Sequence, residues 1–220
     1  MAPTDGPSDS VKLRTMSQLV PEFFRRLDER PDALFYQRPR TASHIDEAAC
    51  RAVRSVYDEL LPAGGRVLDL MAGVRSHLSP RYGHVVGLGM NAEELHANPS
   101  IDEAVIHDLN RDVELPFEPG GFQGVVCTVS VQYMTRPVAT FASVSRLLAP
   151  GAPFAVAISR RMFEQKAVLA WRASDDAAHL RLVRTYFAEA HGFGPVEERH
   201  HEPPEGDPVH VLWARRRHES

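Results

Sequence analysis

From residue 45 onward, the apolar residues of this chain switch repeatedly between short continuous runs and helical spacing, and this alternation constrains the fold most strongly. Such a pattern is typical of strands and helices that follow one another along the chain. Strands are expected at residues 66–70, 84–90, 104–109, 124–131 and 153–159. Each run is almost continuously apolar, as happens when helices cover both faces of a parallel sheet. The chain is therefore expected to form an α/β sandwich of three layers.

Helical spacing marks the segments between these runs. One apolar face before the first strand consists of Ile45, Ala49, Val53, Val56 and Leu60. Ser43 and Asp46 are available as a capping box for this helix. Further helices are expected around residues 92–98, at 137–148, and from Met162 to about His191 with an interruption near 173–179.

The end of the chain has a different character. Residues 195–201 and 208–216 are strand-like and are joined by the loop "EPPEGD", which predicts an antiparallel hairpin at the edge of the sheet. His200 and His201 are adjacent, so in a strand they point to opposite faces. No HExxH motif or pair of CxxC motifs occurs, and no metal site is predicted.

Composition limits the class of protein. With 220 residues, 43% of them hydrophobic, the chain is long enough for one domain with a sizeable core. Its net charge of -4 argues against a nucleic-acid partner, because phosphate binding needs a concentrated basic face. Two cysteines, no apolar stretch of roughly 18 residues and a polar N-terminus predict a cytoplasmic protein without a membrane partner. Nothing in the sequence indicates an oligomeric state.

The expected organisation has three parts. Residues 1–44 form an N-terminal segment and lid, disordered over about 1–10, residues 45–216 form the domain, and residues 217–220 form a tail.

The stretch "VLDLMAGVRSHLSP", residues 67–80, is the first place where chemistry is expected. Asp69 ends the first strand, at the sheet edge where open parallel sheets bind ligands. The following turn has one glycine, Gly73, and carries Met71, Arg75 and His77. The guanidinium of Arg75 suits a planar anion, and His77 is a candidate base. The alternative is that Asp69 caps its own loop and that Arg75 and His77 lie on an exposed surface.

The ordered set of motifs resembles the class I S-adenosylmethionine-dependent methyltransferase family over residues 45–216. The similar stretches are "RVLDL", "VVGLGMNAEEL", "VIHDLNR", "LPFEPGGFQGVVCTVSVQYM" and "SRLLAPGAPFAVAIS". The resemblance implies a Rossmann-like, mostly parallel seven-stranded sheet with an antiparallel C-terminal hairpin strand, and S-adenosylmethionine as cofactor. The cofactor-binding positions that it implies are Asp69, Met71, Gly73, Arg75, Gly89, Met90, Asn91, Asp108, Leu109 and Ser130.

Three features depart from the family's pattern. Met71 and Arg75 stand where glycines are expected, and Gly89 is followed by Met90 and Asn91 where an acidic residue usually accepts bonds from the ribose hydroxyls. As a neutral amide, Asn91 would bond a hydroxyl less strongly than a carboxylate. Gln123 replaces the acidic residue often found before the fourth strand.

The segment "FYQRPRTASHID", residues 35–46, is expected to be ordered and, by resemblance, to cover the cofactor. Candidates for substrate binding are Tyr36, Arg40, Gln132, Arg160 and Phe163, and candidates for catalysis are His77, His44 and Tyr133. The alternatives are a packing aromatic for Tyr36, a surface cation for Arg40, a helix-start histidine for His44 and a solvated helix cation for Arg160.

The resemblance implies methyl transfer to a small-molecule substrate. Such a displacement needs alignment and exclusion of water more than a strong base, and His77 or His44 would serve if a base is needed. Two alternatives stay open. The enzyme cyclises or cleaves S-adenosylmethionine itself, or the chain is a methyltransferase-like partner or regulatory subunit without cofactor turnover.

Overall fold

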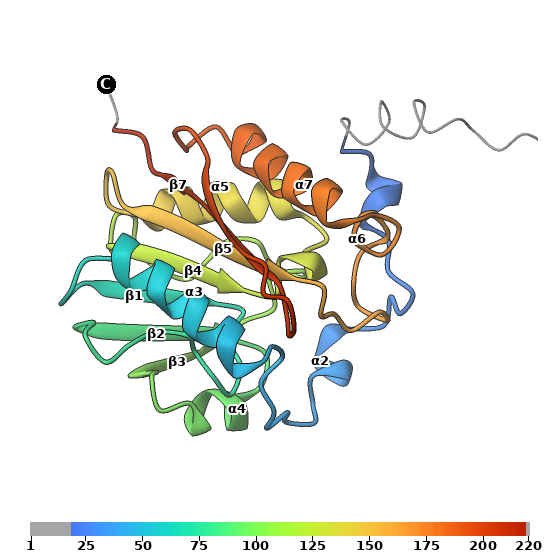
Figure 1. Ribbon diagram of the computed structural model, residues 1–220, viewed down its shortest axis with the longest axis horizontal. Coiled ribbons are helices and arrows are strands. Elements are labelled where there is room, and N and C mark those ends of the chain that lie inside the picture. Colours follow the sequence, from blue (N-terminus) through green and yellow to red (C-terminus); the bar gives the residue numbers. More distant parts are fainter. Residues whose placement is uncertain (1–18, 219–220) are drawn as a thin grey trace, which may run out of the picture.

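A seven-stranded sheet in the order β3-β2-β1-β4-β5-β7-β6 forms the centre of the computed structural model, which describes residues 19–218 (Figure 1). The strands are β1 Arg66–Leu70, β2 His84–Gly89, β3 Glu103–Ile106, β4 Gly124–Thr128, β5 Pro153–Ser159, β6 Glu197–His201 and β7 Val209–Arg215. β1 to β5 pair in parallel, and β7 is antiparallel to both β5 and β6. The expected sheet and its terminal hairpin are confirmed.

Helices cover both faces of this sheet, with α3 on one side and α5 and α7 on the other (Figure 1). The longer helices are α3 Glu47–Leu60, α4 Ala92–Ala97, α5 Pro137–Leu147 and α7 Asp176–Glu189. Short helical turns are η1 Pro21–Phe24, α2 Asp32–Phe35, η2 Val131–Tyr133 and α6 Leu169–Arg172. None of the helices within residues 19–218 has the length and apolar character needed to cross a membrane.

The continuous apolar runs follow from this layering. In β1, Val67 packs with the cluster under α3, whereas Leu68 and Leu70 pack with the cluster under α5 and α7. Successive side chains of a strand point to opposite faces, so every position of β1 needs an apolar or well-bonded side chain.

Helix α3 begins at Glu47 because the Asp46 side chain accepts a hydrogen bond from the Ala49 amide at 2.9 Å. Ser43 does not take part in a capping box, since its hydroxyl donates to the Ile45 carbonyl instead. Asp46 alone therefore caps the helix.

Residues 162–168 are not helical, contrary to expectation. Two of their backbone amides bond to distant groups, because Phe163 donates to the Tyr133 hydroxyl and Val168 to the Gln132 carbonyl. The buried Lys166 ammonium donates to the carbonyls of Asp28 and Arg30 and pairs with Asp32 at 3.0 Å. These contacts fix the segment to the N-terminal region, and helix formation starts only at Leu169.

Strands β3 and β4 end earlier than expected. After β3, the Asp108 carboxylate accepts the Asn110 amide and turns the chain, and after β4, Val129 takes a φ of 49° before η2. The residues expected to be disordered, 1–10, lie outside the part of the chain that the structure describes.

Candidate active site

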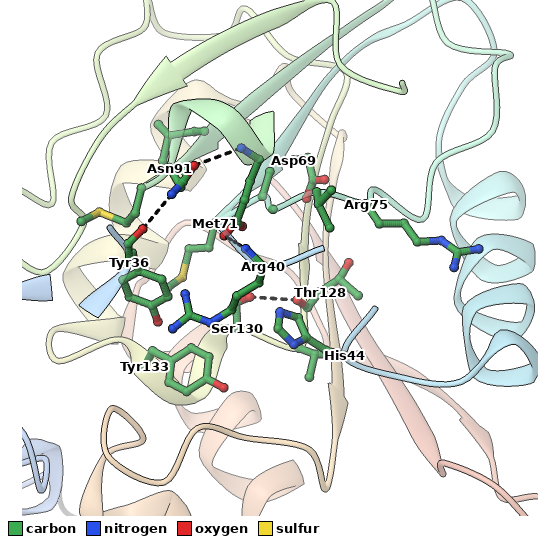
Figure 2. Close-up of a pocket in the computed structure, with 18 of the residues that line it drawn as sticks. Tyr36, Arg40, His44, Asp69, Met71, Arg75, Asn91, Thr128, Ser130 and Tyr133 are labelled. Carbon is green, nitrogen blue, oxygen red and sulfur yellow. Dashed lines mark hydrogen bonds between the residues drawn. The ribbon is translucent and has the colours of Figure 1, made fainter. Parts of the chain in front are cut away.

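A cavity lies at the carboxyl ends of β1, β2 and β4, and residues of the segment 36–44 close it (Figure 2). Strand ends of this kind are where open α/β sheets bind ligands. The predicted site residues that line the cavity are Tyr36, Arg40, His44, Asp69, Met71, Gly73, Arg75, His77, Gly89, Met90, Asn91, Asp108, Leu109, Ser130, Tyr133 and Phe163. Gln132 and Arg160 are not among its lining residues.

The turn after β1 keeps a glycine-like shape without glycine at its first position. Met71 has a φ of 60°, in the left-handed region that favours glycine. The turn is held by the Asn98 amide, which donates to the Gly73 carbonyl and to the Ser76 hydroxyl. Strained conformations persist where the surrounding structure fixes them, and they cluster at functional sites.

Asp69 is buried at the base of this turn. Burial raises the pKa of its carboxyl to about 7, although the Ser76 hydroxyl, which donates to it at 2.5 Å, acts in the opposite direction. This bond is the loop-capping interaction considered above as the alternative role for Asp69.

Arg75 and His77 differ in their surroundings. Arg75 points away from the centre of the cavity toward α3, where it forms two hydrogen bonds with the Glu47 carboxylate, at 2.5 and 3.0 Å (Figure 2). His77 is buried, and burial together with the charge of Arg75 lowers its pKa to about 4. The imidazole is therefore neutral near pH 7, as a base must be.

The end of β2 is shaped by close packing. A Cβ at Gly89 would lie 2.3 Å from the Ala72 carbonyl oxygen, so glycine is needed there for the strand to meet the turn. Asn91 caps α4 by accepting the Glu94 amide, and its side-chain amide donates to the carbonyls of Tyr36 and Gln37 (Figure 2). Asn91, which the resemblance predicted to face the ribose, is thus bonded to the closing segment.

Asp108 and Ser130 bond within their own loops. Asp108 accepts the amides of Asn110 and Arg111, and the Ser130 hydroxyl donates to the Thr128 carbonyl. Both still line the cavity, from the ends of β3 and β4.

Arg40 lies inside an aromatic enclosure. Its guanidinium carbon is 4.6 Å from the ring centre of Phe35, 5.1 Å from that of Tyr36 and 4.7 Å from that of Phe163. Its Nη2 donates to the Phe35 carbonyl, whereas its Nη1 is buried and has no hydrogen-bond partner within residues 19–218. A buried guanidinium nitrogen without a partner is costly unless an acceptor group reaches it.

Tyr133, Phe163 and His44 form the wall beside Arg40. The rings of Tyr133 and Phe163 stack at 5.9 Å, and the His44 ring meets Phe163 edge to face at 5.1 Å. Burial raises the pKa of Tyr133 to about 12, so its phenol stays protonated. His44 lines the cavity and is partly exposed, and partial loss of solvent together with the charge of Arg40 lowers its pKa.

Gln132 and Arg160 have other partners. The buried Gln132 amide donates to the carbonyls of Val129 and Arg161, and the exposed Arg160 pairs with Asp176 at 2.8 Å. Their predicted contact with substrate has no support from these positions.

The lining residues that were not predicted include Asp32, Glu94 and Asn110. Glu94 accepts the Arg40 amide at 2.7 Å, Asn110 bonds both Asp32 and the Tyr133 carbonyl, and Asp32 pairs with Arg26. Asn110 lies two residues after Asp108 in the quoted stretch "VIHDLNR", so its place at the cavity could have been predicted from the sequence. Glu94 likewise lies in the quoted stretch "VVGLGMNAEEL", whereas Asp32 reaches the cavity only through contacts between distant segments.

The strand order, the covering helices and the cavity at the strand ends together define the fold of class I S-adenosylmethionine-dependent methyltransferases. A Methanosarcina mazei S-adenosylmethionine-dependent methyltransferase shares 13% identity at a TM-score of 0.51, over 74% of this chain and 98% of its own. The CurJ carbon methyltransferase shares 17% sequence identity at a TM-score of 0.54, and the match covers 80% of this chain and 57% of its own. The [4+2]-cyclase SpnF shares 12% sequence identity at a TM-score of 0.52, and the match covers 76% of this chain and 81% of its own. No family model and no curated protein matches the sequence.

Proposed function

We propose that this chain transfers the methyl group of S-adenosylmethionine to a small-molecule acceptor that carries an anionic group. The observation that carries the proposal is the cavity at the carboxyl ends of β1, β2 and β4, closed by residues 36–44. Neighbours of the same fold that are S-adenosylmethionine-dependent methyltransferases support the choice of cofactor.

The residues around the β1 turn fit this cofactor. The left-handed conformation of Met71 shapes the turn as a glycine would, and a Cβ at Gly73 would meet a single heavy atom within 4 Å, the Glu94 Oε2. A ligand can therefore approach the backbone of this turn closely at Gly73. In this proposal Asp69, Met71 and Gly73 hold the methionine part of the cofactor, and Asn91 faces the ribose.

When bound, the cofactor supplies a methyl group on a sulfonium that is already activated for displacement. The chain's own residues then need to align the acceptor and exclude water. The unpartnered Nη1 of Arg40 is suited to a carboxylate or similar anion. Tyr133 and Phe163 provide flat apolar surface beside it, and the neutral His77 is the candidate base.

The closing segment has to move before a ligand enters. The cavity contains about 100 Å³ of free space, whereas pockets that enclose drug-sized ligands hold ~300–1,000 Å³. A second candidate function, a methyltransferase-like partner without turnover, is favoured by the bonds from Asn91 to Tyr36 and Gln37, which occupy the amide that would face the ribose.

Calorimetric titration with S-adenosylmethionine and S-adenosylhomocysteine tests the cofactor. Gly73→Val places a branched side chain in the cavity and should weaken binding by at least about tenfold, or ~1.4 kcal/mol. Gly194→Val is the matched control, because its Cβ makes an ordinary 3.6 Å contact outside the cavity. Folded wild-type protein that gives no binding at millimolar ligand would refute the enzyme proposal and favour the partner role.

Arg40 and Arg160 provide a matched pair for the acceptor. With pools of anionic and neutral small molecules, wild-type protein should form S-adenosylhomocysteine from the anionic pool. Arg40→Met should lose this activity and keep cofactor binding, whereas Arg160→Met should keep both. Equal activity in the two variants would contradict the anionic acceptor. A nucleoside product other than S-adenosylhomocysteine, formed without acceptor, would indicate cleavage or cyclisation of the cofactor.

A further inference from the structure

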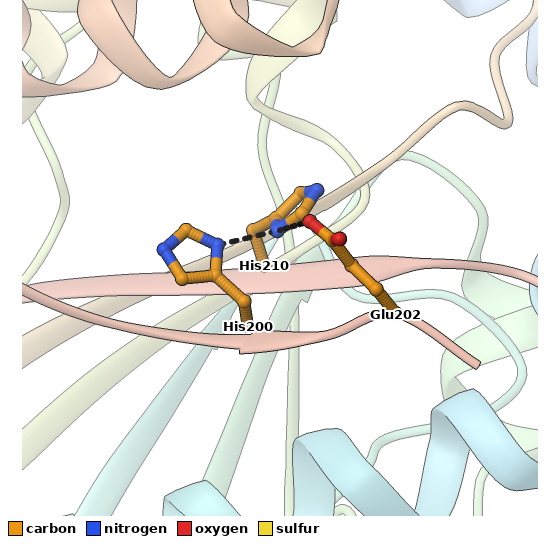
Figure 3. A group of neighbouring side chains, drawn as sticks. All are labelled: His200, Glu202 and His210. Atoms are coloured by element: carbon orange, nitrogen blue, oxygen red, sulfur yellow. Dashed lines mark hydrogen bonds and ion pairs between the residues drawn. The ribbon is translucent and has the colours of Figure 1, made fainter.

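Two histidines face each other across the terminal hairpin, away from the residues that line the cavity. His200 of β6 and His210 of β7 are directly opposite in the antiparallel register, and their Nδ1 atoms are 2.6 Å apart (Figure 3). Glu202 lies two positions after His200, and its Oε1 is 3.9 Å from the His210 Nδ1. The three possible ligand atoms all lie within 4.8 Å of one another.

We infer that His200, Glu202 and His210 form a binding site for a divalent transition-metal ion, with Zn²⁺ as the best match. Two imidazole nitrogens and one carboxylate oxygen are a donor set that Zn²⁺ accepts, with a fourth position for water. In a tetrahedral site, ligand atoms are roughly 3.3 Å apart, as follows from metal–ligand bonds of about 2.0–2.1 Å. The 2.6 Å between the two nitrogens is shorter than this value and the 3.9 Å from His210 to Glu202 is longer, with all three atoms within 4.8 Å of one another, so the side chains have to rotate to complete the site.

The surroundings of His200 favour this role. Its Nε2 lies 3.3 Å from the Glu198 carboxylate, which is itself bonded to Arg184 of α7. A carboxylate that accepts the outer N–H of a histidine fixes the tautomer and directs the lone pair of the other nitrogen toward a metal. His200 therefore presents its Nδ1 lone pair toward His210.

The local charge also suits a cation. The His210 side chain is buried, and its Nδ1 faces the His200 Nδ1 and the Glu202 carboxylate. The positive charges nearby are paired, Arg184 with Glu198 and Arg160 with Asp176. The carboxylate of Glu202 then adds a negative charge to the group of ligands.

A metal ion here would join the last two strands of the sheet. β6 is one of the two edge strands, and its hairpin loop is bonded to the residue that caps α3 through hydrogen bonds between Asp46 and Asp207. Bridging His200 to His210 would hold the edge strand against β7 at the start of that loop. The expected consequence is a hairpin that opens less often when metal is bound.

Cobalt titration of the tag-free full chain, after treatment with a chelator, tests the site. The wild type should bind one Co²⁺ with the visible absorption of a four-coordinate site, and Zn²⁺ should displace it. His200→Ala should weaken binding by at least about tenfold and Glu202→Gln by several-fold. His200 and Glu202 are both exposed, so these variants are expected to fold, which circular dichroism checks.

His201→Ala is the matched control, because this neighbouring histidine points to the other face of β6 and should leave binding unchanged. Absence of saturable one-to-one binding in the wild type would overturn the proposal. So would equal affinity in the wild type and His200→Ala, or equal loss in His200→Ala and His201→Ala.

Discussion

Met71 and Asp69 show that single positions in the β1 turn serve both the fold and the site. Met71 takes a left-handed conformation in place of a glycine, and Asp69 is buried with one hydroxyl donor, Ser76. Neither arrangement is the least strained choice for the fold alone. The Arg40 Nη1, which is buried without a hydrogen-bond partner among the described residues, also lowers the stability of the fold, and it lies at the same cavity.

Asp69→Asn should change how stability depends on pH. Burial raises the pKa of Asp69 to about 7, so the folded state holds a proton that the unfolded state has lost. Wild-type stability should therefore fall as pH rises from about 4 to 7, by a few kcal/mol. Urea unfolding of the wild type and of Asp69→Asn at several pH values measures this change. Every other titratable group is common to both proteins, so the difference between their stabilities isolates the contribution of Asp69. A difference between the two proteins that does not vary with pH would contradict the buried, proton-holding Asp69.

Local sequence could predict which positions line the cavity but not their partners. Asp69, Asn91 and Asp108 were identifiable because strand ends meet at one edge of a parallel sheet. The pairing of Arg75 with Glu47, and the rings around Arg40, depend on residues far along the chain. The facing pair His200 and His210 depends on hairpin register, which the loop between them does not specify in the sequence.

Among the elements, the parallel strands were predictable and the closing segments were not. Each central strand is buried on both faces, so its apolar run is continuous and easily recognised. Residues 162–168 have a helical apolar pattern, yet the amides of Phe163 and Val168 bond to Tyr133 and Gln132, and Lys166 bonds to the N-terminal region. Such tertiary bonds override local helix propensity.

Asn91→Asp and Asn91→Ser should both release the closing segment of residues 36–44. Either residue keeps the α4 cap, but neither donates the amide bonds to Tyr36 and Gln37. Losing two bonds of about 0.5–1.5 kcal/mol each should speed proteolytic cleavage of the segment roughly tenfold. Only the aspartate should also tighten S-adenosylhomocysteine binding, because a carboxylate accepts hydroxyl bonds more strongly. Unchanged cleavage in both variants would show that these bonds do not hold the segment.

In the molecule as a whole, the two proposed sites use different parts of one sheet. The cavity depends on β1, β2, β4 and the segment 36–44, whereas the histidine pair joins β6 to β7 at the sheet's edge. The central strands between them are buried on both faces and are expected to open last. Each ligand should therefore stabilise its own neighbourhood with little effect on the other.

Hydrogen exchange with each ligand alone tests this independence. S-adenosylhomocysteine should slow exchange in residues 36–44 and 71–77, and Zn²⁺ should slow exchange in residues 197–210. At ~100 times the dissociation constant, a ligand adds about 2.7 kcal/mol to the free energy of openings that abolish its site, which slows exchange through them by roughly a hundredfold. At the same ligand concentration, His200→Ala should reduce only the protection by Zn²⁺, and Gly73→Val should reduce only the protection by S-adenosylhomocysteine. Protection of both regions by one ligand would contradict this independence. It would mean that the cavity and the terminal hairpin open together and that the sheet between them couples the two openings.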